Sequence, residues 1–223
     1  MTSLAALHSA LAQGGYIRSV NYHSTPARCA DAYERELEAY ARQFAGVSEG
    51  ELEAFLRTGH WPKSKPGLIL ACYNGYRNNY DVMRPLLERY GFTGWFFVPT
   101  EFVNTAPAQQ SAFAAAHAIR LTADEYPDGR VALDWDELRS LDAKHVIASH
   151  TKTHSRAALD DPSALEREIV GPQRDFCAQL GHPVRSFTWL WGSPFGLNEA
   201  ADAFVLEAGY VSLFSNRAIQ RLS

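Results

Sequence analysis

Short, uniformly apolar runs separated by stretches of helical periodicity constrain the fold of this chain more than any other feature. Residues 67–72, 95–98 and 146–148 are apolar without the alternation that marks a strand with one face in water. Strands of this kind are buried on both faces, which is typical of parallel sheets covered by helices. Further strand patterns occupy residues 16–23, 186–191 and 209–215. Their alternation with helical patterns predicts a parallel α/β sheet, open or closed into a barrel, with helices outside.

The segments between these runs carry the helical patterns. Apolar residues recur at helical spacing in residues 31–44, 82–90, 162–180 and 198–208, and Ser48 with Glu51 forms a capping-box pattern. Gly171-Pro172 lies inside the third of these segments and predicts a kink, since proline has no backbone N–H. Residues 104–131 are the least regular part, and we interpret them as an insertion over one rim of a single domain spanning residues 1–223.

Charge, hydropathy and cysteine usage exclude several classes of function. The net charge of -4 is spread without blocks, which argues against nucleic acid or an anionic membrane surface as partner. No apolar run is long enough to span a bilayer, and residues 1–15 lack the features of a signal peptide. The three cysteines are widely spaced, which predicts free, buried thiols. We therefore expect a cytoplasmic protein, or an exported one if a signal peptide has been removed. The sequence does not indicate an oligomeric state.

Two histidines four residues apart follow the apolar run at 146–148. They are His150 and His154, in the sequence Ser-His-Thr-Lys-Thr-His. If the chain turns into a helix after the strand, both imidazoles lie on one face about 5–6 Å apart, close enough to share a metal ion. Two unrelated surface or core histidines are the alternative that this motif alone leaves open.

Other polar and aromatic residues also stand where predicted strands end. His23, the pair Tyr73-Asn74 and the segment 191–195 all occupy such positions. The carboxyl ends of parallel strands lie at one rim, so we expect these groups to converge there. Trp189 and Trp191 would share one face of a strand, where aromatic rings can stack on sugars, although burial in the core is the usual alternative.

In order along the chain, these motifs resemble the polysaccharide deacetylases, carbohydrate esterase family four. The similarity is greatest to the branch that begins with a Tyr-His strand and acts on poly-N-acetylglucosamine-type polymers. Residues 70–80 lie where the family has Thr-Phe-Asp-Asp-Gly and a Tyr-x-x-Asn-Tyr continuation, and residues 94–100 resemble its Thr-Phe-Phe-Val strand. Residues 149–154 match its His-Ser/Thr-x-x-His motif, and residues 187–196 resemble the motif that ends in Pro-Phe-Gly. The resemblance implies a distorted (β/α) barrel with parallel strands.

The resemblance also implies a reaction and a set of site residues. Family members remove N-acetyl groups from amino-sugar polymers or oligomers with a divalent metal (zinc, or cobalt or nickel) held on Asp-His-His. In this sequence His150, His154 and Asn74 match the metal positions, and Tyr73 stands at the position of the aspartate that acts as general base. From their places at predicted strand ends we expect His23, Trp191, Pro194 and Phe195 to contact the substrate. A purely structural role at the rim is the alternative for His23, and burial in the core is the alternative for the aromatic residues.

The sequence departs from the family in its first motif and at its end. Tyrosine, with a pKa near 10, replaces the base, and asparagine removes the negative charge that helps to hold a dication. The family's Leu-x-His motif has no match before Ser223, so we expect either that a C-terminal element is missing from this sequence or that this member never had one. These departures predict a weak or absent metal and a weak or lost deacetylation. The alternative is a non-catalytic member that binds saccharide or regulates a partner.

Overall fold

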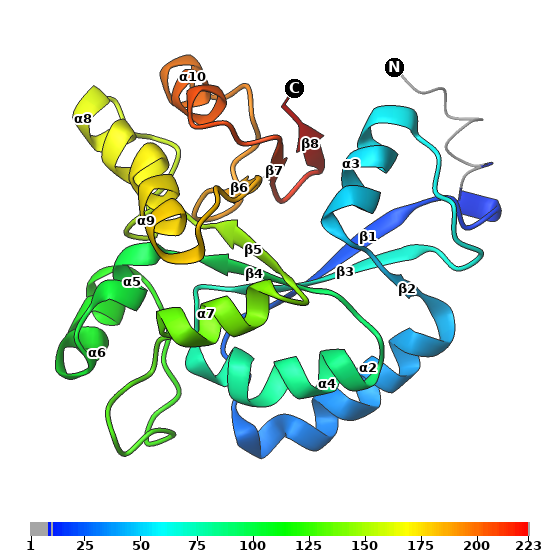
Figure 1. Cartoon of the computed structure of the whole chain (residues 1–223), viewed down its shortest axis with the longest axis horizontal. Coiled ribbons are helices and arrows are strands. Elements are labelled where there is room, and N and C mark those ends of the chain that lie inside the picture. Colours follow the sequence, from blue (N-terminus) through cyan, green and yellow to red (C-terminus); the bar gives the residue numbers. More distant parts are fainter. Residues whose placement is uncertain (1–8, 10, 223) are drawn as a thin grey trace.

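One eight-stranded sheet organises the part of the chain that the computed structural model describes, residue 9 and residues 11–222 (Figure 1). Most of residues 1–15, the segment considered as a signal peptide, lies outside the described residues. The strands are β1 Ile17–Tyr22, β2 Ala45–Gly46, β3 Gly67–Tyr73, β4 Gly94–Val98, β5 Val146–Ser149, β6 Ser186–Thr188, β7 Ser212–Phe214 and β8 Ile219–Arg221. Their order is β1-β3-β4-β5-β6-β7-β8, with β2 paired to β3.

The predicted parallel topology is confirmed. Strands β3, β4, β5 and β6 are parallel neighbours in that order, and the sheet curls into a distorted half-barrel. Strand β8 is the exception, because it pairs antiparallel with β7 in a terminal hairpin that the sequence pattern did not predict. Strand β2 was also missed, since two residues are too few to show a periodicity.

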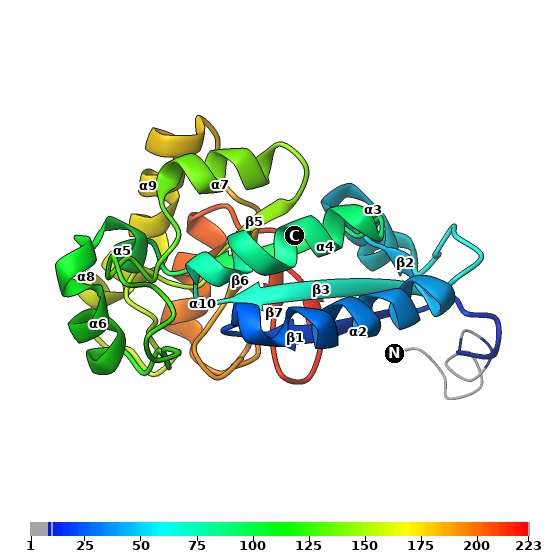
Figure 2. The same cartoon turned by 90° about the horizontal axis from the view of Figure 1, so that it is seen from below.

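Helices surround this sheet, with α2, α4 and α7 along one side of it (Figures 1 and 2). The helices are α2 Ala30–Gln43, α3 Glu49–Thr58, α4 Arg84–Arg89, α5 Thr100–Asn104, α6 Pro107–Ala116, α7 Trp135–Asp142, α8 Pro162–Leu165, α9 Gly171–Leu180 and α10 Glu199–Glu207. Shorter turns are the 3-10 helix Ala27–Cys29 and the π-helical turns Asn79–Met83 and Glu166–Val170. Helix α3 begins with the predicted capping box of Ser48 and Glu51.

Burial on both faces of the sheet explains the uniformly apolar runs. Along β3, Leu68 and Leu70 belong to the cluster that packs against helices α2, α4 and α7. Ile69 and Ala71 point the opposite way, into the curl of the sheet. Large side chains fill this interior, among them Trp61, Trp95, Phe97 and Phe214. The strands can therefore bury alternate residues in two separate apolar layers, and no face of β3 needs polar residues.

Residues 104–131 contribute helix α6 and no strand of the sheet. They share a small apolar cluster with Tyr76 and Phe102. Two backbone hydrogen bonds tie the end of this segment to the chain after β3, from Arg77 N–H to the Val131 carbonyl and from Leu133 N–H to the Gly75 carbonyl, both 2.9 Å. The segment is thereby held at the rim where β3 ends, and its interpretation as an insertion stays a prediction.

Two properties of the whole chain can be compared with the sequence. No helix in the described part is long and apolar enough to cross a membrane. All three cysteines are free, as predicted, but only Cys72 is buried. Cys177 is exposed on helix α9, so the expectation of buried thiols is wrong for that residue.

Candidate functional site

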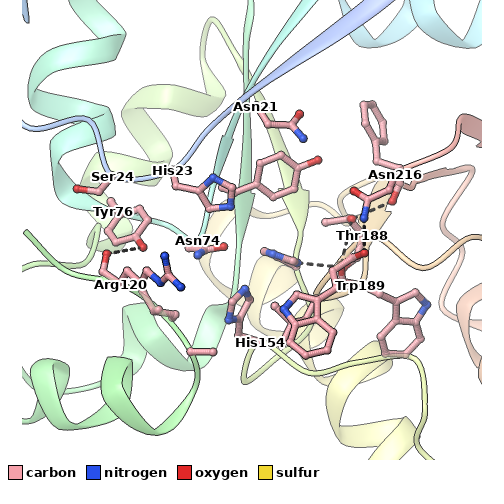
Figure 3. Close-up of a pocket in the computed structure, with 18 of the residues that line it drawn as sticks. Asn21, His23, Ser24, Asn74, Tyr76, Arg120, His154, Thr188, Trp189 and Asn216 are labelled. Carbon is pink, nitrogen blue, oxygen red and sulfur yellow. Dashed lines mark hydrogen bonds between the residues drawn. The ribbon is translucent and has the colours of Figure 1, made fainter. Parts of the chain in front are cut away.

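A cavity of about 1090 Å³ opens at the rim formed by the carboxyl ends of the parallel strands (Figure 3). Most of the predicted site residues line it: His23 after β1, Tyr73 and Asn74 at the end of β3, His150 and His154 after β5, and Trp191 after β6. Residues far apart in the sequence therefore meet at one rim, as a parallel sheet requires. Pro194 and Phe195 do not line the cavity, and Phe195 instead packs against the main apolar core.

The two histidines of the motif lie together, with ring centroids 4.6 Å apart and planes at 83°. A tight turn produces this geometry where we had considered a helix, and Thr151 and His154 have left-handed backbones in it. Nδ1 of His150 lies 3.2 Å from the Thr188 carbonyl, and Nδ1 of His154 lies 2.7 Å from the His117 carbonyl. These contacts assign the proton of each ring to Nδ1 and leave both Nε2 lone pairs for a ligand. Burial lowers the pKa of both imidazoles.

A fully buried carboxylate beneath the turn holds it in place. Glu168 accepts hydrogen bonds from the backbone N–H and the hydroxyl of Thr153, at 2.8 and 2.9 Å. The Glu168 carbonyl also accepts from Lys152 N–H at 3.1 Å. That carbonyl lies four residues before Pro172, which has no N–H to offer it. Pro172, which follows the π-helical turn Glu166–Val170, therefore leaves the Glu168 carbonyl without the helical hydrogen bond that residue 172 would otherwise make. This carbonyl is free to anchor the histidine turn through Lys152 N–H.

Asn74 brings an unpaired oxygen to the same wall of the cavity. Its backbone is left-handed, with φ of 73°, a conformation that asparagine tolerates better than most residues. The side chain is buried, and its Oδ1 has no hydrogen-bond partner. Figure 3 shows it next to His154. A buried carbonyl without a partner is costly in a folded protein, which points to a ligand at this position.

Asn74, His150 and His154 together fit a divalent cation, but only with neutral donors. An amide oxygen and two imidazole nitrogens are acceptable ligands for zinc. No group of three or more His, Cys, Asp or Glu residues that could hold a metal occurs in the part of the chain the structure describes. The donor set therefore matches a weakly held ion, because no carboxylate balances the charge of a dication.

Tyr73 fills the wall of the cavity as an aromatic residue. Its ring stacks on Phe97, with centroids 4.7 Å apart and planes at 8°, and on the other side lies near His23 at 5.6 Å. Its ring also meets His150 edge-on at 5.4 Å. Burial raises the pKa of the Tyr73 phenol well above its usual value. A phenol in this environment stays protonated at neutral pH and cannot act as a general base.

Trp191 stands at the mouth of the cavity, 62% exposed. The prediction that Trp189 and Trp191 share a strand face is wrong, because β6 ends at Thr188 and Trp191 has a left-handed backbone. Trp189 is buried against Phe187 at a centroid distance of 4.9 Å. The Asn216 amide of the terminal hairpin donates to the Trp191 carbonyl at 2.6 Å and fixes the turn. Trp191 thus presents a large aromatic surface beside the site.

The family model for "Polysaccharide deacetylase" matches residues 62–211, more than half of the chain. The chain belongs to the polysaccharide deacetylase family. A search of curated proteins finds no match. Similar solved structures include IcaB from Ammonifex degensii, with 16% identity over 91% of this chain and 84% of that one and a TM-score of 0.68. The de-N-acetylase from Aggregatibacter actinomycetemcomitans has 16% identity over 93% and 91%, with a TM-score of 0.67.

A third similar structure is the Streptococcus pyogenes deacetylase PplD in complex with acetate, with 14% identity over 92% of this chain and 84% of that one and a TM-score of 0.67. At these identities the likeness establishes the fold, a distorted (β/α) barrel. The family as a whole makes this chain a relative of hydrolases that cleave amide bonds. Its own chemistry has to be argued from the cavity.

Sequence reasoning missed several residues of this cavity. Arg120 lines it from the irregular segment after α6, where no periodicity distinguishes one residue from its neighbours. Asn216 lines it from the β7–β8 hairpin, which was not predicted. Asn21 lines it from β1, and its place on an exposed strand position gave no functional signal. Glu168 was assigned to a helix without a role, because the contact that matters is to a distant turn.

Proposed function

We propose that this chain binds an N-acetylated amino-sugar oligomer or polymer in the rim cavity and hydrolyses its N-acetyl groups weakly or not at all. One observation carries the proposal: Tyr73 is stacked and buried where the family has its general base. No Asp or Glu is among the residues that line the cavity in the described part of the chain, so no carboxylate is placed to take over. Loss of a general base costs about 10²–10⁴ in rate.

The other residues of the cavity support binding more than turnover. Trp191 offers an exposed ring on which the apolar face of a sugar can stack, and Asn21 and Asn216 add amide groups to the lining of the cavity. Asn74, His150 and His154 would hold a divalent cation, which when bound would polarise the amide carbonyl of the substrate. Tyr73 occupies the wall from which a base would act, and its phenol keeps its proton.

Deacetylation of acetylated chitooligosaccharides should be below about one hundredth of that of an active relative, because the chain lacks a base. The measurement is acetate release from N-acetylchitotetraose with added zinc, cobalt or nickel, with the de-N-acetylase from Aggregatibacter actinomycetemcomitans assayed in parallel. The metal content of the purified protein is measured on the same samples. Robust acetate release by the unmodified chain that His150→Ala abolishes would refute the proposal and require a different base.

Binding of the same oligosaccharide should depend on Trp191. Replacing Trp191 by alanine removes the stacking surface and should weaken N-acetylchitotetraose binding by up to about tenfold, in line with about 0.5–1.5 kcal/mol for an aromatic contact. Isothermal titration calorimetry measures this loss. Leu197→Ala is the matched control, because Leu197 is 65% exposed but does not line the cavity. Equal affinities for both variants and the unmodified chain would place the saccharide elsewhere.

A further inference from the structure

The charge balance of the cavity is the opposite of what a site for cations needs. No Asp or Glu is among its lining residues in the described part of the chain. Both tyrosines of the lining have a raised pKa. Arg120 is the one permanently charged residue that lines the cavity in the described part of the chain. The cavity therefore carries a positive charge with no carboxylate to neutralise it.

Arg120 is held at the rim by the contacts of its own segment. The Tyr76 hydroxyl donates to the Arg120 carbonyl at 2.8 Å, and Ile119 N–H donates to the Ala114 carbonyl at 2.9 Å. Three residues earlier, the His117 carbonyl contacts His154. Figure 3 shows the Arg120 side chain turned into the cavity, toward Asn74. Arg120 is exposed, and its guanidinium makes no ion pair or hydrogen bond with any of the described residues, so its donors are free for a ligand at the rim of the cavity.

A second arginine stands at the mouth of the cavity. The Arg156 guanidinium lies 3.4 Å from the centroid of the Trp191 ring, a cation–π contact at the platform where a sugar would stack. It adds positive potential at the entrance. Such a potential disfavours the ammonium group that deacetylation leaves behind, and it also disfavours a dication on the neutral donors of Asn74, His150 and His154.

We propose that this cavity recognises an acidic amino-sugar saccharide, with Arg120 binding the carboxylate of one sugar unit. The inference rests on the proposed saccharide binding and names the class of saccharide. The planar guanidinium presents paired N–H donors that match a carboxylate in a bidentate contact. A sugar carboxylate carries one charge, as the lining does, whereas a phosphate monoester carries about −1.5 to −2 at pH 7. The N-acetyl groups of neighbouring units then lie near Tyr73 and the two metal-position histidines.

The test compares an acidic saccharide with its carboxyl-reduced form, which lacks the charge, and with a neutral saccharide in which every unit is N-acetylated. Isothermal titration calorimetry on the full chain after chelator treatment uses a hyaluronan tetrasaccharide, its carboxyl-reduced form and N-acetylchitotetraose. The acidic tetrasaccharide should bind about tenfold or more tightly than the two neutral ones. Arg120→Gln should remove this preference, because it takes away the charge that strengthens the hydrogen bonds to the carboxylate. Arg120→Lys keeps the charge but loses the paired N–H donors of the guanidinium, so it should retain only part of the preference for the acidic tetrasaccharide.

A charge-matched control and two further measurements complete the test. Arg57→Gln removes an exposed arginine on helix α3, outside the cavity, and should leave the preference unchanged. The preference should also shrink as salt is raised, since exposed charges are screened. Equal binding of all three saccharides would overturn the acidic preference and leave the proposed function standing, whereas no binding of any would overturn both. Acetate is titrated as a further ligand. If the acidic tetrasaccharide binds no more tightly than acetate, the site recognises only a small carboxylate, and the inference is overturned.

Discussion

Replacing Asn74 by aspartate should tighten zinc binding by about a hundredfold. The side chain already lies beside the histidine pair, its Oδ1 has no partner, and aspartate tolerates the left-handed backbone at this position. The added carboxylate charge attracts the doubly charged ion, and the cost of burying that carboxylate offsets much of the gain. A hundredfold change in affinity corresponds to about 2.8 kcal/mol. Adding Tyr73→Asp supplies a second charge and should tighten binding further.

Zinc titration by calorimetry measures this effect in the two variants and in the unmodified chain. Asn21→Asp is the matched control, because it adds the same charge to the lining of the cavity on β1, at a position that Figure 3 shows apart from His154. It should change the affinity far less. The melting temperature of the double variant has to be recorded too, since Tyr73→Asp removes the stack on Phe97. Stoichiometric zinc that the unmodified chain keeps through dialysis against chelator would contradict the prediction.

The sequence determined the arrangement of the sheet well, because that arrangement depends on burial. Uniformly apolar strands such as Gly67–Tyr73 have to be covered on both faces, and this requirement alone selects a parallel sheet under helices. Polar residues that end such strands then meet at one rim. Tyr73, Asn74, His150 and His154 could therefore be assigned to one site before their distances were known.

The rest of the site depends on backbone turns, which leave little trace in the sequence. The backbone of Trp191 is itself left-handed, so Trp191 does not continue the strand that contains Trp189, although the sequence pattern predicts a continuous strand. Asn74, Ala118 and His154 also have left-handed backbones, and all three line the cavity. Strained residues of this kind cluster at functional sites, where surrounding contacts compensate for their cost. Contacts to the histidine turn come from residues distant in the sequence, the His117 carbonyl and Glu168, and a single sequence does not show such pairings.

Glu168 should be the residue on which the geometry of the histidine turn depends most. Its carboxylate is completely buried and accepts from the Thr153 N–H, the Thr153 hydroxyl and Arg167 Nε, the last at 3.1 Å. Replacing it by alanine leaves the Thr153 N–H without an acceptor and opens a cavity, while the Thr153 hydroxyl keeps only its contact with Ser155 at 3.0 Å. We expect a loss of about 2–4 kcal/mol in the free energy of unfolding, the range for removing one partner of a buried charged network.

Urea denaturation of three variants separates this network from a general effect of substitution. Glu168→Gln keeps one acceptor for the Thr153 N–H, and its amide can donate to the Thr153 hydroxyl, so it should cost only about 1 kcal/mol. Glu166→Ala changes a half-exposed residue of the same π-helical turn and should stay within about 0.5 kcal/mol of the unmodified chain. Hydrogen exchange at the Thr153 amide gives a local readout, and it should accelerate in Glu168→Ala but not in Glu166→Ala. Unchanged exchange in Glu168→Ala would mean that other contacts hold the turn, such as the hydrogen bond from Ser155 N–H to the Thr151 hydroxyl at 2.8 Å.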